Sequence, residues 1–487
     1  MSETLPGAAL APDGEKLAQL SNSSRRARWR RRALIAIAAL LYEIIWVATA
    51  FDKVNPTDLD VFFFPAAHIA LAGNPLDIYQ FRDGGYPNAN GPLGLAPVLL
   101  AAWLANLRGW LGDVVLRRAL VFAITAPFPL LAGWEAARIV ERFGGRLRGL
   151  ARALPYLPLA FALELWLSAL YYGHVEQVIA VWLTLVALRL LIERHEITAG
   201  ALLGLALLAR SDVLLIILPI TLLLLIRRQT SAAIWFAVGI VDAFMAGILP
   251  FLIADPRDTI FSLVAFRGPL PVGGGNIWSL SDANTFLLIG QRYDALLTIG
   301  AATLLTLIVL ALRRDLTLTS ADLFGVLTVS ALCFALLIKM LWPYYYQEAA
   351  LFATIWALAR SVAPLRARGG AWLMQIGALS LAWLPRLAIL TCALVAEYGL
   401  EAVNYSGWLP PWGLTLAALN LIVVSITLGT LLIGPRILQL FTSHLIPAPQ
   451  DILPEMALSV SADGEDHSRP MTLTKRLAQD NSDAITQ

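Results

Sequence analysis

The sequence predicts an all-α fold: a polytopic bundle of transmembrane helices, with about 11 to 13 membrane segments and two external loops that carry short interfacial helices. The first observation is composition, because 58% of the 487 residues are hydrophobic and only 14% are charged, whereas soluble domains contain about 25% charged residues. The second is that apolar runs of about 20 residues, enough to cross a bilayer, recur along the chain. The third is that arginine clusters separate these runs, as in the cytoplasmic loops of membrane proteins. These observations disfavour a soluble globular protein.

Residues 1–32 are expected to form a disordered, basic, cytoplasmic segment. Six arginines lie between positions 25 and 32, directly before the first apolar run, Ala33 to Phe51, and such clusters stay in the cytoplasm. We interpret this run as an uncleaved span, because a long polar leader precedes it and no small-residue cleavage site follows it. The chain then emerges on the outer side. Glu43 lies within the span and is expected to face other helices or a cavity.

The first external loop, residues 52–90, is the place where we expect the chemistry. Two carboxylates, Asp58 and Asp60, come just after the first span. The phenylalanine-rich segment that follows, Val61 to Ala72, predicts a short amphipathic helix lying in the membrane interface. Gly73, Asn74 and Pro75 end this helix.

The next two apolar segments, Pro92 to Leu107 and Arg118 to Val140, leave the topology open. If both cross the membrane, the basic run from Arg138 to Arg152 lies outside, against the positive-inside rule. If the first is a re-entrant or outer-leaflet helix, the run lies inside. We favour the second alternative, because the first segment is short and contains Pro92 and Pro97.

A helical hairpin is predicted in the middle of the chain. Spans at Leu154 to Tyr172 and Val175 to Leu191 place the polar stretch from Tyr171 to Gln177 on the outer side. The apolar run Thr198 to Ile226 would be about 44 Å long as one helix, too long for one untilted crossing, and Arg210-Ser211-Asp212 interrupts it. We therefore expect two short helices that rise and return, with the polar tripeptide near the outer half of the membrane.

A further span at residues 231–253, which contains Asp242, leads to the second external loop, residues 254–281. The remaining predicted spans are Leu296 to Leu312, Leu323 to Leu341, Ala349 to Val362, Ala371 to Val395 and Trp412 to Ile433. Their order puts the Arg313-Arg314 pair and Arg436 on the cytoplasmic side, in agreement with the positive-inside rule. The transmembrane domain thus covers residues 33–435, and residues 436–487 are expected to form a mostly disordered cytoplasmic tail.

The polar residues expected near the outer interface make up the candidate site. A carboxylate beside a water-filled cleft acts as a general base toward a hydroxyl, and Lys or Arg side chains hold a phosphate. Asp58 is the candidate catalytic residue, and the candidate substrate-binding residues are Asp60, Tyr86, Asn88, His174, Glu176, Gln177, Arg210, Asp212, Lys339, Tyr344 and Tyr345.

Simpler roles for these residues stay open. Asp58 is also placed to cap the helix that follows it, and Arg210 is placed to pair with Asp212. Lys339 could extend to the interface from a span end, and the run Tyr344 to Tyr346 could belong to an aromatic belt. Within the apolar segments, Arg386 needs a partner such as Glu43, Glu164 or Asp242, unless it lines a cavity.

Several short motifs follow one another in order between residues 33 and 435. They are Asp58-Leu59-Asp60-Val61-Phe62, Ala66-Ala67, Gly73, Ile78-Tyr79, Tyr86-Pro87, Gly173-His174-Val175-Glu176-Gln177, and the half-helix from Ala199-Gly200 to Ala209-Arg210. In this order and membrane placement they resemble the polytopic GT-C glycosyltransferases, most closely glycosyltransferase family 87, which includes polyprenyl-phosphomannose-dependent mannosyltransferases. One motif departs from the family pattern, since Trp342-Pro343-Tyr344-Tyr345 stands where the family shows Trp-x-His-Tyr.

The resemblance implies a function and a location. Asp58 would be the catalytic acid/base, and a hexose such as mannose would pass, with inversion, from a polyprenyl-phosphate sugar donor to a lipid or glycan acceptor. Membrane lipids would be further partners, and no cofactor, metal, nucleotide sugar or nucleic acid is expected. The protein would lie in the bacterial plasma (inner) membrane with both termini in the cytoplasm and the site facing outside. The missing histidine leaves the second catalytic group unassigned.

Two other classes of function are compatible with the sequence. Glu43, Glu164, Asp242 and Arg386 could serve a proton or ion path in a membrane transporter or lipid flippase, although repeated halves and paired broken helices are not evident. A non-catalytic membrane partner of an envelope-assembly complex would leave the outer carboxylates without a purpose.

Overall fold

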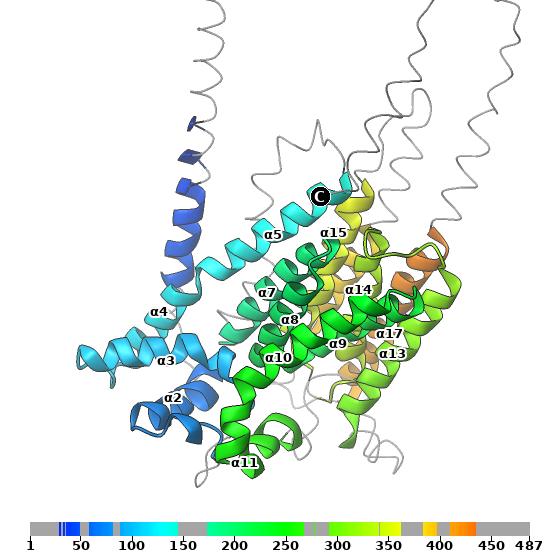
Figure 1. Cartoon of the computed structure of the whole chain (residues 1–487). Helices are drawn as coiled ribbons and strands as arrows, with labels where there is room; N and C mark the ends of the chain where they lie inside the picture. The colour runs from blue at the N-terminus through cyan, green and yellow to red at the C-terminus, as the bar shows by residue number, and fades with distance from the viewer. Residues whose placement is uncertain are drawn as a thin grey trace, which may run out of the picture. The chain divides into compact units, whose positions relative to one another are not determined.

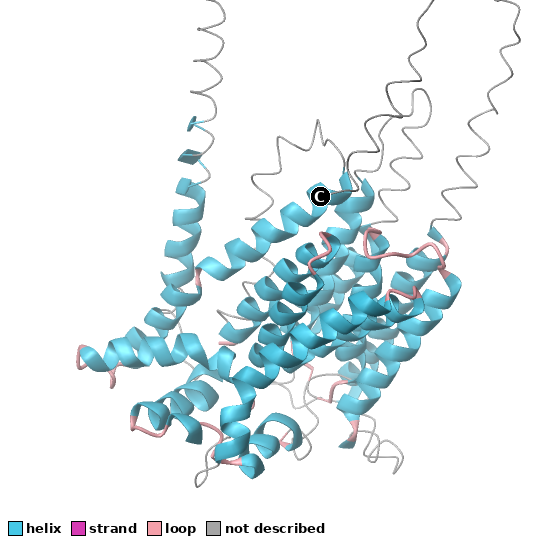
Figure 2. Ribbon diagram, in the orientation of Figure 1, coloured by secondary structure: helices cyan, strands magenta, loops and turns pink. Residues whose placement is uncertain are grey.

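The computed structural model describes residues 29–30, 33–34, 36–48, 58–80, 88–144, 173–266, 278, 292–339, 341–361, 383–396 and 410–434. In this part of the chain all regular structure is helical and no strand occurs (Figure 2). The predicted all-α fold is therefore confirmed. Most of the two predicted tails, the predicted span at 154–172, Tyr86 and Glu164 lie outside the described residues.

Five runs in the described residues are long and apolar enough to cross a membrane: Val114–Phe143, Val175–Ile192, Thr230–Ala254, Asp294–Leu312 and Thr415–Leu432. The first run joins α4 (Val114–Thr125) and α5 (Pro127–Gly144), and the others correspond to α7 (Val175–Ile192), α10 (Thr230–Ala254), α13 (Asp294–Leu312) and α17 (Pro410–Leu432). Shorter helices pack among them, including α14 (Asp322–Leu337) and α15 (Gln347–Ser361) (Figure 1). The composition and length of these helices support a multi-span membrane protein.

The run predicted as a helical hairpin is broken at the expected residues. Helix α8 (Glu196–Ala209) has 14 residues and α9 (Leu214–Ile226) has 13, so each is about 20 Å long, shorter than the hydrocarbon layer of about 30 Å. A 3₁₀ turn, Ser211–Val213, joins them. Just before the start of α8 and just after the end of α9, Arg194 Nη1 donates to Gln229 Oε1 at 3.2 Å. Both ends of the hairpin therefore lie at the same end of the bundle.

Helices α8 and α10 pack closely because small residues face one another. A Cβ atom on Gly200 would lie 2.1 Å from the backbone oxygen of Phe236, and one on Gly239 would lie 2.2 Å from that of Ile197. Such contacts leave no room for a side chain, as is common where helices associate in membranes. Figure 1 shows α7, α8 and α10 side by side.

Helix α3 (Pro92–Leu107) and the helix that follows it both begin at the same end of the bundle. At its start, a Cβ on Gly94 would lie 2.8 Å from the Cβ of Glu176. The helix that follows, α4, begins at Val114, where the Asp113 carboxylate accepts from the Leu116 backbone N–H. Near that start Arg118 pairs with Asp60 at 2.5 Å. The starts of α3 and α4 thus lie at the same end of the bundle, and α4 begins four residues earlier than the predicted span because Asp113 caps it. The non-crossing path of α3 stays a prediction.

Short helices occur in both predicted external loops, and contacts join the two loops. The first loop contains the π-helix η1 (Leu59–Phe63), α2 (Phe64–Leu71) and the 3₁₀ turn η2 (Pro75–Asp77), and the second contains α11 (Pro256–Ile260) and the π-helix η7 (Phe261–Ala265). Ser262 Oγ donates to the Tyr79 carbonyl at 3.0 Å, and the Phe62 and Phe266 rings meet edge to face with centroids 6.4 Å apart. The predicted helix Val61 to Ala72 therefore begins earlier and divides into a π and an α part.

Charged residues gather at the two ends of the bundle. We call the end with His174 and Arg210 the site end, and the end with Glu193 and Arg313 the far end. At the far end, Arg189 donates to Glu135 and Glu193, and Arg142 also pairs with Glu193. These contacts tie α5 to the end of α7.

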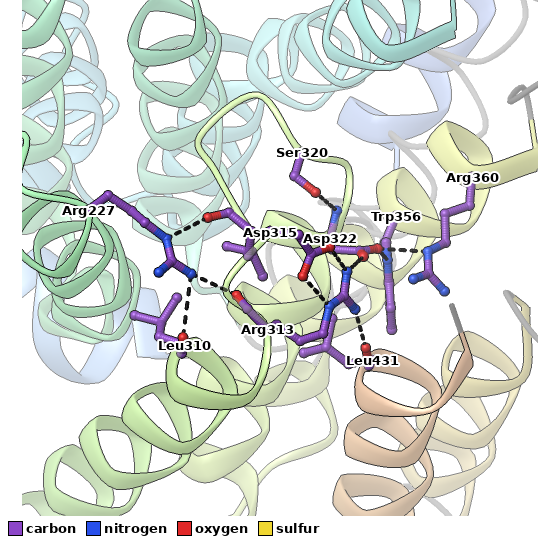
Figure 3. Close-up of polar contacts among 10 residues, drawn as sticks. Arg227, Leu310, Arg313, Asp315, Ser320, Asp322, Trp356, Arg360 and Leu431 are labelled. Carbon is purple, nitrogen blue, oxygen red and sulfur yellow. Dashed lines mark hydrogen bonds and ion pairs between the residues drawn. The ribbon is translucent and has the colours of Figure 1, made fainter. Parts of the chain in front are cut away.

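Asp322 is the centre of a second far-end network, drawn in Figure 3. One of its oxygens accepts from Arg313 Nη2 at 2.6 Å, and the other accepts from Trp356 and Arg360 at 2.9 and 2.7 Å. Arg313 also donates to the Leu431 carbonyl, near the end of α17. Arg227 donates to carbonyls at and beyond the end of α13, those of Leu310, Arg313 and Leu316. The network thus joins α9, α13, α14, α15 and α17.

Replacing Asp322 by Asn is expected to destabilise the bundle by about 3–5 kcal/mol, because the Arg360 guanidinium loses its counter-charge and the buried Arg313 guanidinium keeps only the exposed Asp315 carboxylate. Unfolding of the purified protein in detergent measures the effect. Asp315→Asn is the matched control, since that carboxylate also pairs with Arg313 but is 67% exposed; its cost should stay below about 1 kcal/mol. Equal losses in both variants would contradict a structural role for the buried network.

Candidate active site

Asp58 lies directly before η1 and points toward α7. Its Oδ2 atom is 2.8 Å from His174 Nε2, and its side chain is 38% exposed. The side chain makes no capping hydrogen bond to the helix that follows, so the helix-cap alternative does not describe this residue. Asp58 is therefore a partly exposed carboxylate held by an imidazole at the site end of the bundle.

His174 is held on both ring nitrogens. Its Nδ1 lies 2.6 Å from Glu176 Oε1, and the Tyr344 hydroxyl lies 2.5 Å from its Nε2. Burial alone would lower the pKa of His174, but the Glu176 and Asp58 carboxylates outweigh it and raise that pKa to about 9. The ring is thus an imidazolium at neutral pH and links two carboxylates.

The local backbone explains how His174 reaches this position. Gly173 has φ +80°, a left-handed conformation that favours glycine, and His174 occupies the position just before the first residue of α7. Glu176 and Gln177 follow in the first turn of α7, where both are buried, and most of the later residues of this helix are apolar. The Gly-His-x-Glu-Gln sequence therefore delivers three polar side chains to one place.

Arg210 comes from the tip of the α8–α9 hairpin. Its Nη1 donates to Glu176 Oε1 at 3.2 Å and its Nε donates to Asp212 Oδ2 at 2.7 Å. The guanidinium also lies over the rings of Tyr344 and Tyr345, 5.9 and 5.6 Å from their centroids. The alternative in which Arg210 pairs with Asp212 is the one observed, and binding a phosphate would require the guanidinium to exchange these partners.

Gln177 contacts Glu348, a residue that was not among the candidates selected from the sequence. Its amide nitrogen donates to Glu348 Oε1 at 2.7 Å and to the Tyr344 carbonyl at 3.3 Å. Glu348 stands four residues after Tyr344, a helical spacing that puts both on one face. A carboxylate in the first turn of an apolar helix was the available signal, but its partner on α7 lies 171 residues away.

Asp60 lies beside the site but has a structural partner. Arg118 contacts it through Nη2 at 2.5 Å and through Nε at 3.1 Å, and Arg118 is 4% exposed. This paired contact fixes η1, the helix that starts immediately after Asp58, against α4. Arg118 was missed as a site neighbour because the sequence analysis treated it only as the start of a span.

Two other candidates lie in separate surroundings. Lys339 is buried just after α14, where its backbone N–H donates to Asp294 Oδ2 at 3.0 Å. Burial lowers the pKa of Lys339, and the Asp294 carboxylate opposes that effect. Asn88 is 2% exposed and its Oδ1 accepts from the Asn90 N–H before α3. The candidate Tyr86 lies outside the described residues.

The charged residues predicted within the membrane spans, among them Arg386 and Asp242, have different surroundings from one another. Arg386 lies over the Trp383 ring, 5.2 Å from its centroid, and Asp242 is exposed on α10. Among the described residues, no group of three or more His, Cys, Asp or Glu side chains is arranged to hold a metal ion. The charged residues brought together are those at the site end.

No protein-family model matches the sequence, and no curated protein matches it. The geometry of the site therefore carries the functional argument. Its main elements are the partly exposed Asp58 carboxylate and the His174 imidazole, which has a partner on each ring nitrogen. From Asp58 to Asp212, negative and positive side chains alternate in contact with one another.

The stability of the folded protein is expected to fall as the pH rises from 6.5 toward about 9. The pKa of His174 is raised in the folded chain, so its contribution is complete below 6.5 and is lost as the pH passes about 9. Thermal unfolding in detergent over this range, for the wild type and for His174→Gln, measures the effect. The variant should lose this part of the pH dependence, and identical curves would show that His174 does not cause it.

Proposed function

We propose that the protein is an integral membrane glycosyltransferase that moves a hexose from a polyprenyl-phosphate sugar donor to a lipid or glycan acceptor. The observation that carries the proposal is the Asp58–His174 contact of 2.8 Å at one end of a helical bundle. The contact holds a partly exposed carboxylate where the ends of α7 and α8 meet the first external loop. A general base toward a hydroxyl needs such a position, with one side fixed and the other open.

In this proposal the transfer is a single inverting displacement. The acceptor hydroxyl gives its proton to Asp58, its oxygen bonds to the sugar C1, and the C1–O bond to phosphate breaks with the electron pair leaving on the phosphate. His174 engages Oδ2 of Asp58, and among the described residues no hydrogen bond is formed by Oδ1, which would receive the proton. Of the two predicted phosphate ligands, Arg210 and Lys339, Arg210 is the one connected to the Asp58–His174 pair, because Glu176 contacts both Arg210 and His174.

Two further contacts lie at the site end. Phe62 of the first external loop and Phe266 of the second meet edge to face, so both loops contribute aromatic side chains to the end of the bundle where a lipid-linked donor would bind. Tyr344, which stands where the resemblance expects a histidine, contacts His174 instead. The imidazole of the proposed centre is thus supplied by α7.

A transporter or lipid flippase is the second candidate. The observation that favours it is the broken hairpin α8–α9, whose tip carries Arg210 and Asp212 into the bundle. Half-helices that end at ionisable residues are a feature of transporter binding sites. Movement of a labelled lipid in proteoliposomes, without formation of a glycosidic bond, would favour this candidate over the first.

Replacing Asp58 by Asn is expected to lower sugar transfer at least about 100-fold, since a general base contributes about 10²–10⁴ in rate. Transfer of radiolabelled sugar from a polyprenyl-phosphate donor in membranes, at wild-type expression, measures this. Asp77→Asn is the matched control, because it removes a carboxylate from the same loop outside the His174 centre, and it should keep full activity. Full activity in the Asp58 variant would remove Asp58 from its role. Mass spectrometry of envelope glycolipids in a deletion strain would identify the sugar and acceptor.

A further inference from the structure

A small cavity lies inside the bundle next to the site. Its volume is about 30 Å³, which is enough for one or two waters or a single ion, since one water needs about 10–15 Å³ by this measure. Apolar and aromatic side chains form most of its wall, including Val181, Phe334 and Phe352. Its polar lining comes from four residues on α7, the hairpin tip, and the segment that starts α15: Thr184, Asp212, Tyr345 and Glu348.

Thr184 presents an unpartnered hydroxyl to this cavity. The residue is 4% exposed, lines the cavity, and forms no hydrogen bond in the part of the chain that the structure describes. Comparable buried threonines on other helices, Thr125 and Thr328, donate to the carbonyl four residues earlier. A buried hydroxyl without a partner costs about 1–3 kcal/mol, so a bound group in the cavity would satisfy it.

The charges around the cavity do not balance. Three carboxylates, those of Glu176, Asp212 and Glu348, surround the Arg210 guanidinium, and His174 provides one further positive charge. With Glu348 ionised, three negative and two positive groups leave one negative charge in excess. Burial and the nearby Asp212 carboxylate raise the pKa of Glu348 to about 7, so the excess is present above that pH. Asp58 adds a further carboxylate, but it is 38% exposed at the rim and is reached by water.

Neighbouring charged residues do not supply the missing charge. Arg118 is paired with Asp60, and the Lys339 ammonium group feels the charge of the Asp294 carboxylate, so each of these cations has a carboxylate of its own. An uncompensated charge inside a membrane protein is costly. One cation bound in the cavity would therefore fill the space and balance the excess negative charge.

We propose that this cavity binds one monovalent alkali-metal cation through the carboxylates of Glu348 and Asp212 and the hydroxyl of Thr184. Oxygen donors suit hard cations, and broken helices in membrane transporters take part in Na⁺ sites. A proton on Glu348 would remove the same excess charge, but it would leave the cavity unfilled. Asp58 is not a ligand of this site, although the proposed ligand Asp212 also pairs with Arg210, the phosphate ligand of the proposed sugar transfer.

The test is binding of radioactive sodium to the purified full-length protein in detergent, with choline chloride replacing other salts. One saturable site per chain is expected, together with a rise in the unfolding temperature in sodium chloride relative to choline chloride. Thr184→Val keeps the shape and removes the donor, and it should weaken sodium binding at least about tenfold, a free-energy change of about 1.4 kcal/mol. Glu348→Gln should abolish binding.

Thr125→Val is the matched control, because this buried threonine has the same hydroxyl bonded within its own helix, and its sodium affinity should equal that of the wild type. Absence of saturable binding, or stabilisation by acid alone without any sodium effect, would overturn the proposal. Unchanged affinity in Thr184→Val would also overturn it, and this variant decides the matter if Glu348→Gln does not fold. Asp58→Asn should bind sodium normally, so loss of sugar transfer and loss of cation binding are distinguishable.

Discussion

Burial of the Glu176 carboxylate is the constraint on which the site end of the bundle depends. The side chain has no exposed area, and one of its oxygens contacts both His174 and Arg210. A carboxylate withdrawn from water without such partners would cost several kcal/mol. The start of α7 and the tip of the α8–α9 hairpin must therefore meet, and Gly94 allows α3 to close over them because a larger residue would collide with Glu176.

The separation of charge into two ends follows from the same physics. Along α7 the distance from Glu176 to Glu193 is about 26 Å at 1.5 Å per residue, close to the thickness of a hydrocarbon layer. Between these ends the helices bury apolar side chains, and among the described residues the paired arginines lie at one end or the other. The far-end network around Asp322 fixes helix ends, whereas the site-end network leaves one carboxylate, Asp58, partly open to solvent.

The sequence was sufficient for features that depend on local pattern. Hydrophobic runs predict the helices, and the Arg210-Ser211-Asp212 interruption predicts the hairpin. It was insufficient for features that depend on pairing across the fold. Nothing near Arg118 in sequence indicates Asp60, and nothing near Glu348 indicates Gln177, because each contact forms only when separate helices pack. The glycosyltransferase resemblance stays a prediction, since it rests on motif order and no family model matches it.

The π-helix after Asp58 has a consequence for how this loop tolerates change. A π turn holds one more residue than an α turn, and here it spans Leu59–Phe63, between Asp58 and the helix α2. Winding these same residues as a regular α-helix would rotate Asp58 relative to α2 by roughly 100°, the rotation of one residue. The aspartate would then face away from the imidazole, although every residue needed for the contact would still be encoded. The local winding, as much as residue identity, is thus under constraint between Asp58 and Phe64.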